Sequence, residues 1–244
     1  MDLVIDAGNT LVKIGFFHNE LLERTENVPS NDLHGMYNIL SGLSFNHIIL
    51  GSVISFPNHL LSYLKSKSKL FLMYSSDLPL PFKNSYSKSG GSDRLAMAAA
   101  AWKKYPHTNT LVIGIGSCIT TNFISEKGVF SGGSISPGIQ MRFKSLHQFT
   151  SALPSLIFDS ETEVKLKGNT TEGSMYSGVI NGILFEIKGF IQAYHKKYSS
   201  LKCIICGGDS RYIGEKLQED IEIDPELVLY GLHSILNFNA EKKH

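Results

Sequence analysis

The sequence predicts an α/β protein made of two similar lobes. An apolar run, a polar turn with glycine and a second apolar run occur over residues 3–17, and the same order returns over residues 110–125. Helix-like segments follow both copies, and strands followed by helices, twice over, are typical of a duplicated α/β architecture. We therefore expect an N-terminal lobe over residues 1–109 and a C-terminal lobe over residues 110–244, with a ligand site in a cleft between them.

The first lobe is expected to open on a β-hairpin, since residues 3–17 place a Gly/Asn turn between two apolar runs. Apolar runs predict two further strands at residues 47–53 and 69–74. A loop rich in Pro, Ser, Lys and Gly follows over residues 75–92. A run of alanines then favours a helix from Arg94 to Tyr105, which ends before a proline.

The second lobe is predicted to begin with a strand, a Gly-rich turn and a returning strand, at residues 110–113, 114–117 and 119–125. Apolar periodicity predicts a helix at residues 139–149 and a long helix at residues 171–198. The last expected elements are a strand at residues 201–206, a helix near residues 212–218 and an apolar segment at residues 225–236.

The composition is that of a globular protein, with 42% apolar and 18% charged residues over 244 positions. The formal net charge of +1 gives no strong field to attract nucleic acid or an anionic membrane surface. No apolar run approaches the roughly 18 residues of a membrane span, and an N-terminus with Asp2 and Asp6 is unlike a secretory signal. Three cysteines do not make a disulfide framework, so we expect a protein of the reducing cytoplasm.

Cys203 and Cys206 form a C-x-x-C pair inside an apolar run that predicts a buried strand. Residues three apart on a strand point to opposite faces, so these two thiols cannot bind one metal ion. The sequence has no second pair of this kind, and we expect neither a zinc site nor a redox site here.

The turn after the first predicted strand carries polar groups that suit a nucleotide. Gly8 lets backbone amides approach a ligand closely, and Asn9 and Thr10 add side-chain donors. Asp6 offers a carboxylate to a hydrated cation, and Lys13 adds a positive charge on the second strand. Together these groups could hold a polyphosphate. The alternative is a surface hairpin in which Gly and Asn serve a positive φ angle.

A second polar motif precedes the Ala-rich helix. Asp93 could act as a general base that takes a proton from a substrate hydroxyl, and Arg94 offers a planar fork for a carboxylate. The alternative role for Asp93 is an N-cap that accepts hydrogen bonds from backbone amides of the helix.

These motifs stand in an ordered series along nearly the whole chain. The series is Asp6-x-Gly8-Asn9-Thr10 with Lys13, Gly91-x-Asp93-Arg94, Gly132-Gly133-x-Ile135-x-Pro137-Gly138, Thr150-x-Ala152-Leu153-Pro154, Thr171 with Gly178, Gly207-Gly208-Asp209, and Pro225-Glu226-Leu227-Val228-Leu229-x-Gly231-Leu232. No single piece is specific, but the ordered set resembles that of the type III pantothenate kinase family.

The resemblance implies an actin-like α/β fold made of two duplicated ribonuclease-H-like lobes with a cleft between them. It implies a homodimeric enzyme that uses ATP and Mg²⁺ to phosphorylate pantothenate to 4'-phosphopantothenate, the first step of coenzyme A biosynthesis. Asp93 would be the catalytic base. The residues implied for ATP are Asp6 (through Mg²⁺), Ala7, Gly8, Asn9, Thr10, Lys13, Gly116 and Ser117. The residues implied for pantothenate are Tyr86, Gly91, Ser92, Asp93, Arg94 and Thr171.

One position departs from the family's pattern. The family's second motif reads D-x-G-T, in which the aspartate binds a monovalent cation, whereas this chain has Gly114 in place of the aspartate and Ser117 in place of the threonine. A further aspartate usual downstream is Asn122. The resemblance therefore implies an incomplete site for K⁺ or NH₄⁺.

Three other functions remain open at this point. Gly114 could mark a degenerate relative that binds nucleotide but is a weak kinase. The chain could phosphorylate another small alcohol. A regulatory role is a third alternative, because relatives have carried a transcription-activator label, but the chain lacks a recognisable DNA-reading module.

Overall fold

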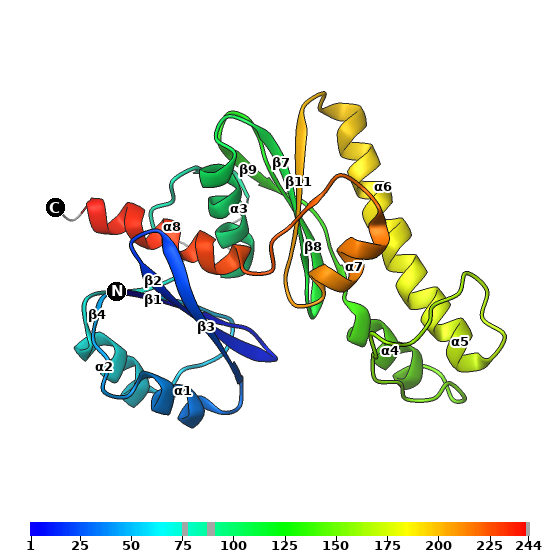
Figure 1. The fold of residues 1–244 in the computed structure, drawn as a ribbon, viewed down its shortest axis with the longest axis horizontal. Helices are drawn as coiled ribbons and strands as arrows, with labels where there is room; N and C mark the ends of the chain where they lie inside the picture. The colour runs from blue at the N-terminus through cyan, green and yellow to red at the C-terminus, as the bar shows by residue number, and fades with distance from the viewer. Residues whose placement is uncertain (75–77, 87–90, 243–244) are drawn as a thin grey trace. The chain divides into compact units, whose positions relative to one another are not determined.

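The computed structural model describes residues 1–74, 78–86 and 91–242 (Figure 1). The chain forms two compact units. The first unit contains Met1–Pro106, Gly128–Ser131 and Glu226–His244, and the second contains His107–Lys127 and Gly132–Pro225. The first unit thus takes in the C-terminal end of the chain. The division into lobes at residues 109 and 110 stays a prediction.

The first unit is built on a sheet with the strand order β3-β2-β1-β4-β5. Its first two strands form the predicted antiparallel hairpin, and β1, β4 and β5 run parallel. The strands are β1 (Asp2–Ala7), β2 (Leu11–His18), β3 (Leu21–Pro29), β4 (Phe45–Ser52) and β5 (Ser68–Met73). A short strand, β6 (Lys83–Asn84), pairs in parallel with β9 (Val129–Gly132).

Helices pack on both faces of this first sheet (Figure 1). One face carries α1 (Leu33–Leu40) and α2 (Asn58–Ser66), and the other carries α3 (Ser92–Lys104) and α8 (Leu227–Glu241). The side chains of β1 alternate between the two cores: Leu3 packs with the first pair of helices and Val4 with the second. A strand with both faces buried has no polar face, which explains the continuous apolar run in the sequence.

The alanines of α3 serve a close approach to α8. A Cβ atom on Gly231 would lie only 1.8 Å from the carbonyl oxygen of Ala96, so a larger residue at position 231 would force the helices apart. The helix begins at Ser92, two residues before the predicted Arg94, and ends at Lys104.

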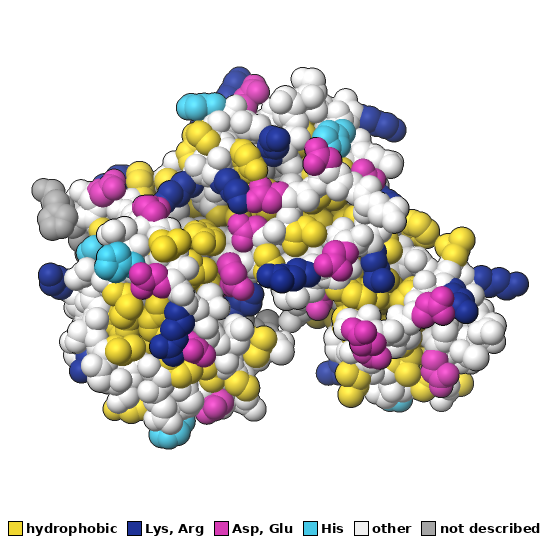
Figure 2. All heavy atoms as spheres, viewed as in Figure 1, with side chains coloured by type: hydrophobic (Ala, Val, Ile, Leu, Met, Phe, Trp, Pro, Cys, Tyr) yellow, Lys and Arg dark blue, Asp and Glu magenta, His cyan; other side chains and the backbone are white. Residues whose placement is uncertain are grey.

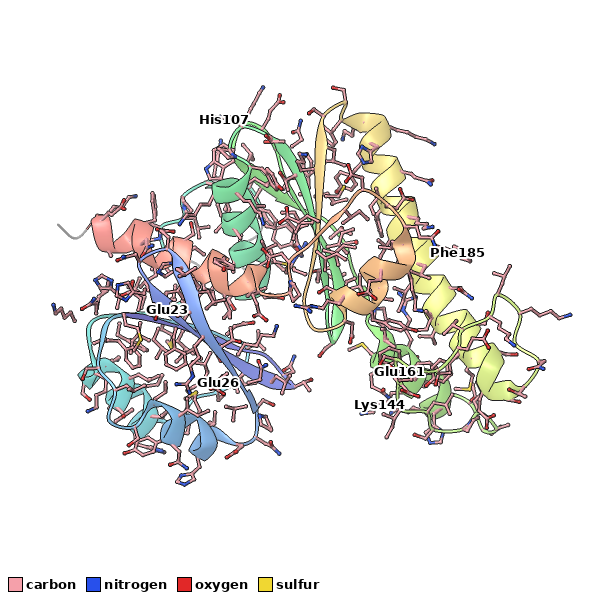
Figure 3. All side chains as sticks on the ribbon, viewed as in Figure 1. Glu23, Glu26, His107, Lys144, Glu161 and Phe185 are labelled. Atoms are coloured by element: carbon pink, nitrogen blue, oxygen red, sulfur yellow. The ribbon has the colours of Figure 1, made fainter. Side chains whose placement is uncertain are left out.

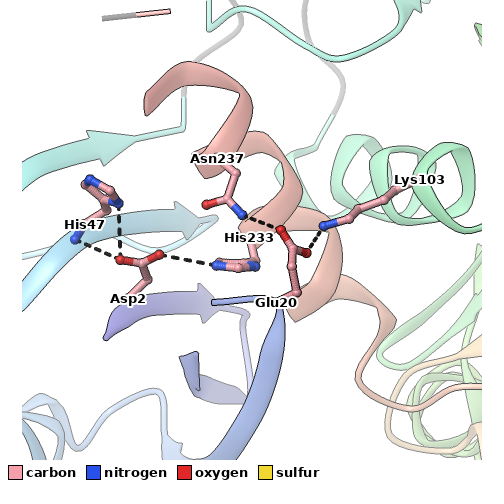
Figure 4. Close-up of polar contacts among 6 residues, drawn as sticks. All are labelled: Asp2, Glu20, His47, Lys103, His233 and Asn237. Atoms are coloured by element: carbon pink, nitrogen blue, oxygen red, sulfur yellow. Dashed lines mark hydrogen bonds and ion pairs between the residues drawn. The ribbon is translucent and has the colours of Figure 1, made fainter. Parts of the chain in front are cut away.

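Polar contacts of His233 and Asn237 join α8 to β1 and to the β2–β3 turn (Figure 4). His233 is 1% exposed, stacks on Phe17 with ring centroids 4.0 Å apart, and places Nε2 3.4 Å from an Asp2 carboxylate oxygen. Glu20 in the β2–β3 turn accepts hydrogen bonds from Asn237 of α8, at 3.1 Å, and from Lys103 of α3. These contacts hold the C-terminal helix in the first unit.

The second unit is built on strands in the order β12-β11-β7-β8, with β10 paired to β8. The strands are β7 (Asn109–Ile115), β8 (Cys118–Ile124), β10 (Ile135–Pro137), β11 (Leu201–Cys206) and β12 (Glu222–Ile223). The helices are α4 (Ile139–Gln148), α5 (Thr171–Tyr176), the π-helix η1 (Ser177–Asn181), α6 (Gly182–Lys197) and α7 (Ser210–Leu217). The predicted long helix is therefore confirmed, but a π-turn interrupts it.

Cys203 and Cys206 are both buried in β11, and only Cys203 belongs to the core cluster formed with the helices. Burial, together with the nearby Asp220 and Glu219 carboxylates, raises the pKa of the Cys203 thiol to about 11.

Figure 2 shows positive and negative side chains interspersed over the visible face, in keeping with the net charge of +1. Within the described part of the chain, none of the helices has the length and apolar character to cross a membrane.

Candidate active site

The β1–β2 turn is tight and exposed. The Gly8 amide donates a hydrogen bond to the Leu11 carbonyl at 3.0 Å. Ser30, directly after β3, supports the turn: its amide donates to the Thr10 carbonyl at 3.1 Å and its hydroxyl donates to the Asn9 carbonyl at 2.7 Å. Neither Gly8 nor Asn9 has a positive φ angle. A backbone requirement for positive φ, the alternative explanation of this sequence, is therefore wrong.

Asp6 lies near the end of β1, opposite Lys13 in the hairpin register. Burial and the nearby Asp93 carboxylate raise the pKa of Asp6 to about 7, against the opposing effect of the Lys13 ammonium group. Lys13 also lies 3.9 Å from a carboxylate oxygen of Glu226. Asp6 and Asp93, 87 positions apart in the sequence, thus form a pair of interacting carboxyl groups.

The carboxyl ends of the parallel strands β1, β4 and β5 bring Asp6, Ser52 and Tyr74 to one edge of the sheet. The N-terminus of α3 reaches the same edge, because a Cβ atom on Gly51 would lie 3.4 Å from the Ser92 hydroxyl. Open α/β sheets generally bind ligands at this edge.

Burial and the Asp93 charge raise the pKa of Tyr74 to about 12. Sequence reasoning missed Tyr74, although its position directly after a strand could have indicated it.

Asp93 lies inside the first turn of α3 and is not its N-cap. Gly91 takes the N-cap position and has no side chain to cap the helix. A Cβ atom on Gly91 would lie 2.5 Å from a carboxylate oxygen of Asp93, so glycine leaves room for that side chain. The helix dipole favours a negative charge in the first turn. The capping explanation for Asp93 is therefore wrong, and its carboxylate is left for another role.

Arg94 is 4% exposed and lies against Tyr86. Its guanidinium group donates to the Tyr86 hydroxyl at 3.2 Å, and its Cζ lies 4.8 Å from the centre of the Tyr86 ring. The Tyr86 ring packs edge-on against Phe130, with centroids 5.9 Å apart. This packing holds the guanidinium fork in one orientation, and Arg94 directly follows Asp93 in α3.

In the second unit, the β7–β8 turn contains Gly116 and Ser117. The Gly116 amide donates to the Cys118 carbonyl at 3.0 Å, and Ser117 is exposed. Gly114 is a buried strand residue, paired with Thr120 of β8 and Cys206 of β11, and its φ angle is not positive.

Thr171 is the first residue of α5, but the capping residue is Thr170, whose hydroxyl accepts from the Gly173 amide at 3.0 Å. Thr171 lines a cavity of about 960 Å³ within the second unit, together with Arg142, Ser145 and residues of α5 and η1. Asp6, Tyr86, Asp93 and Arg94 are brought together in the first unit, whereas Ser117 and Thr171 belong to the second.

A family model described as type III pantothenate kinase matches residues 2–193. The type III pantothenate kinase of Christiangramia forsetii is 41% identical, over 98% of this chain and 99% of its own. A putative Baf family transcriptional activator from Campylobacter jejuni has a solved structure that matches with a TM-score of 0.64 and 22% identity, over 98% of this chain and 99% of its own. A ROK family glucokinase from Streptomyces griseus, solved with glucose and AMPPNP, matches with a TM-score of 0.54 and 10% identity, over 97% of this chain and 99% of its own. These structural matches show a shared actin-like α/β fold.

Proposed function

The chain belongs to the type III pantothenate kinase family, and we propose the roles that its residues take in phosphorylating pantothenate with ATP. This reaction is the first step of coenzyme A biosynthesis. The observation that carries the proposal is that Asp6 and Asp93 interact at the carboxyl edge of the first sheet, while Tyr86 holds the guanidinium group of Arg94, the next residue of α3.

The β1–β2 turn is proposed to bind the phosphates of ATP. Ala7 and Gly8 end the strand, Asn9 and Thr10 are exposed at the turn, and Lys13 supplies a positive charge. Gly116 and Ser117 are proposed as the corresponding turn of the second unit.

Asp6 fits the Mg²⁺ that such a reaction needs. Burial, followed by the charge of the neighbouring Asp93 carboxyl group, raises the pKa of Asp6 despite the opposing Lys13 charge, so its ionised form lacks compensation from the protein. A divalent cation held through water would supply that charge and would neutralise the phosphates. No cluster of three or more His, Cys, Asp or Glu side chains suits a metal ion among the described residues, so the protein would contribute few ligands.

Asp93 is proposed as the base that accepts the proton of the pantothenate hydroxyl while the oxygen attacks the γ-phosphorus and ADP departs. Arg94, held by Tyr86, is proposed to bind the pantothenate carboxylate. Gly91, Ser92 and Thr171 complete the proposed contacts with pantothenate.

A coupled assay of ADP release tests the function directly. Pantothenate and ATP should give steady turnover that depends on Mg²⁺, and other small alcohols should give little. Turnover with a different alcohol, and none with pantothenate, would overturn the substrate assignment.

Replacement of Arg94 by alanine should raise the KM for pantothenate by about 10- to 100-fold, because a charge-assisted hydrogen bond contributes roughly 1.5–3 kcal/mol. The KM for ATP should change much less. Initial rates with each substrate varied in turn provide the measurement.

Tyr86→Phe is the companion variant, because it removes only the hydroxyl that accepts from the guanidinium group and keeps the charge of Arg94, so it should raise the KM for pantothenate less than Arg94→Ala does. A thermal melt must accompany both variants, since Arg94 is buried. A rise in the ATP KM without a rise in the pantothenate KM would contradict the assignment.

Gly114 is proposed to leave the monovalent-cation position without a carboxylate. Turnover should therefore depend little on whether K⁺, NH₄⁺ or neither is present at equal ionic strength. Gly114→Asp should create such a dependence, and the φ angle at this position permits a side chain. Because Gly114 is buried between β8 and β11, a thermal melt of the variant is the folding control. Strong, saturable activation of the unmodified enzyme by K⁺ would contradict the idea.

A homodimer is proposed from the apolar side chains that the second unit exposes. Ile135 is 61% exposed, Met141 is 43% exposed, and Phe185, labelled on α6 in Figure 3, is 62% exposed. Sedimentation should report twice the mass of the 27.0 kDa chain. The cytoplasm is the proposed location, where the thiols of Cys118, Cys203 and Cys206 would stay reduced.

A further inference from the structure

The β7–β8 turn is held by the junction between β10 and α4. The Gly138 amide donates to the Ser117 carbonyl at 3.0 Å. The contact is so close that a Cβ atom on Gly138 would lie 2.0 Å from the Gly116 carbonyl oxygen. Pro137 and Ser136 also pair with β8 directly after the turn. The position of this junction therefore sets the position of Ser117.

Arg142 and Glu186 hold the junction from the other side. Arg142 donates from Nε to the Pro137 carbonyl at 2.8 Å, and its Nη2 donates to Glu186. The Ser136 hydroxyl donates to the other carboxylate oxygen of Glu186. The Glu186 carboxylate on α6 thus links two groups next to Pro137. They are the Ser136 side chain and the Arg142 guanidinium, which donates to the Pro137 carbonyl.

These contacts matter because the junction has few local restraints. Proline has no amide hydrogen to donate. Gly138 is the N-cap of α4 and has no side chain to make a capping bond. The Arg142 and Glu186 side chains are only 21% and 23% exposed, so water screens their attraction less than on an open surface. The contact with the Glu186 carboxylate fixes the orientation of the Arg142 guanidinium group, which then holds the Pro137 carbonyl in place.

We propose that Glu186, acting through Arg142, is a positioning residue for the β7–β8 turn and thereby for the binding of ATP phosphates at Ser117. The inference rests on the proposed role of Ser117. Glu186 itself has no place in any of the motifs that carry the family resemblance, and it lies in the middle of a long helix. Only the folded structure brings it to the turn.

Glu186→Gln keeps the size of the side chain and an acceptor for Ser136 but removes the charge that holds Arg142. We expect the affinity for ATP to fall roughly 3- to 30-fold, in the range of coupling within one polar network. The KM for pantothenate and the turnover at saturating ATP should stay within about twofold. Glu186 is preferred to Arg142 for this test, because Arg142 also lines the cavity that contains Thr171.

The matched control is Glu163→Gln, which breaks an exposed ion pair with Lys165 in the same unit by the same chemical change. Its affinity for ATP should equal that of the unmodified enzyme. Thermal melts of both variants show whether a loss of fold contributes.

The decisive measurement is a double-mutant cycle on the full-length enzyme, with the dissociation constant of a fluorescent ATP analogue as the readout. Ser117→Ala should weaken binding, and Glu186→Gln should add little to Ser117→Ala, because both act on one turn. If Ser117→Ala weakens binding and Glu186→Gln does not, the positioning role is wrong and the role of Ser117 stands. If Ser117→Ala leaves binding unchanged, the proposed phosphate contact is itself wrong. Equal losses for ATP and pantothenate in Glu186→Gln would indicate a general structural role and would also overturn the inference.

Discussion

Asp93→Asn is expected to lower turnover by about 10²–10⁴-fold, the usual effect of removing a positioned base. The amide has the shape of the carboxyl group but cannot take the proton of the pantothenate hydroxyl. Because Asp93 is not the N-cap of α3, this loss should come without a loss of fold. Steady-state rates measure the loss of turnover, and a thermal melt of the same preparation shows whether the fold is retained.

The affinity of Asp93→Asn for ATP distinguishes two roles for Asp93, that of a catalytic base and that of a general binding residue. It should equal or exceed that of the unmodified enzyme, since the substitution removes a negative charge near Asp6 and the phosphates. Tyr74→Phe is a control for this variant, because Tyr74 lies near Asp93 but has no proposed role in the proton transfer. Turnover of Asp93→Asn within a few-fold of the unmodified enzyme would exclude the base role.

Asp6→Asn is expected to lower kcat/KM for ATP by about 10²–10³-fold, comparable to the loss of one preorganised charge-stabilising group. The same substitution should make the metal-free protein more stable. In the folded protein the pKa of Asp6 is about 7, whereas its ordinary value is 3.8. The folded state therefore holds a proton more tightly than the unfolded state does.

The sign of the pH dependence follows from that difference. A carboxyl group with a raised folded pKa contributes stability below its unfolded pKa, and the contribution declines as the pH rises from about 4 to about 7. Asparagine does not titrate, so the gain in melting temperature from Asp6→Asn should be small at pH 4 and largest at pH 8. Melts in EDTA over this range measure it.

Asp2 provides a matched control with the opposite sign, on the same strand. Burial alone would raise the pKa of Asp2, but the hydrogen bond with His233 and the charges of His47 and His233 outweigh burial and lower it. The attraction requires both an ionised carboxylate and protonated histidines, so Asp2→Asn should cost stability near pH 5 and less at lower pH. If both variants changed the melting temperature in the same direction at every pH, the electrostatic argument for Asp6 would fail.

Sequence patterns predicted the elements with long apolar runs. The β1–β2 hairpin, β4, β5, α3, the β7–β8 hairpin, α4, β11 and α7 all occur within a few residues of their predicted positions. These elements bury one or both faces, so their apolar residues report the fold directly.

Elements that are short or mostly polar were missed. Most residues of β3 are exposed or only half-buried, and α1 and α2 bury only two side chains each. The strands β6 and β12 are two residues long and exist only through their pairing partners. Nothing local in the sequence distinguishes such segments from loops, because their stability comes from long-range contacts.

The sequence by itself determined the duplicated α/β organisation, the polar turns and the family, because residue identity and order carry that information. Only the tertiary structure decided that Asp6 and Asp93 share one environment, that Tyr86 orients Arg94, and that Glu186 reaches the β7–β8 turn through Arg142. The physical reason is that a pKa and a side-chain orientation depend on burial and on neighbours from distant segments. Those neighbours are defined only when the chain has folded.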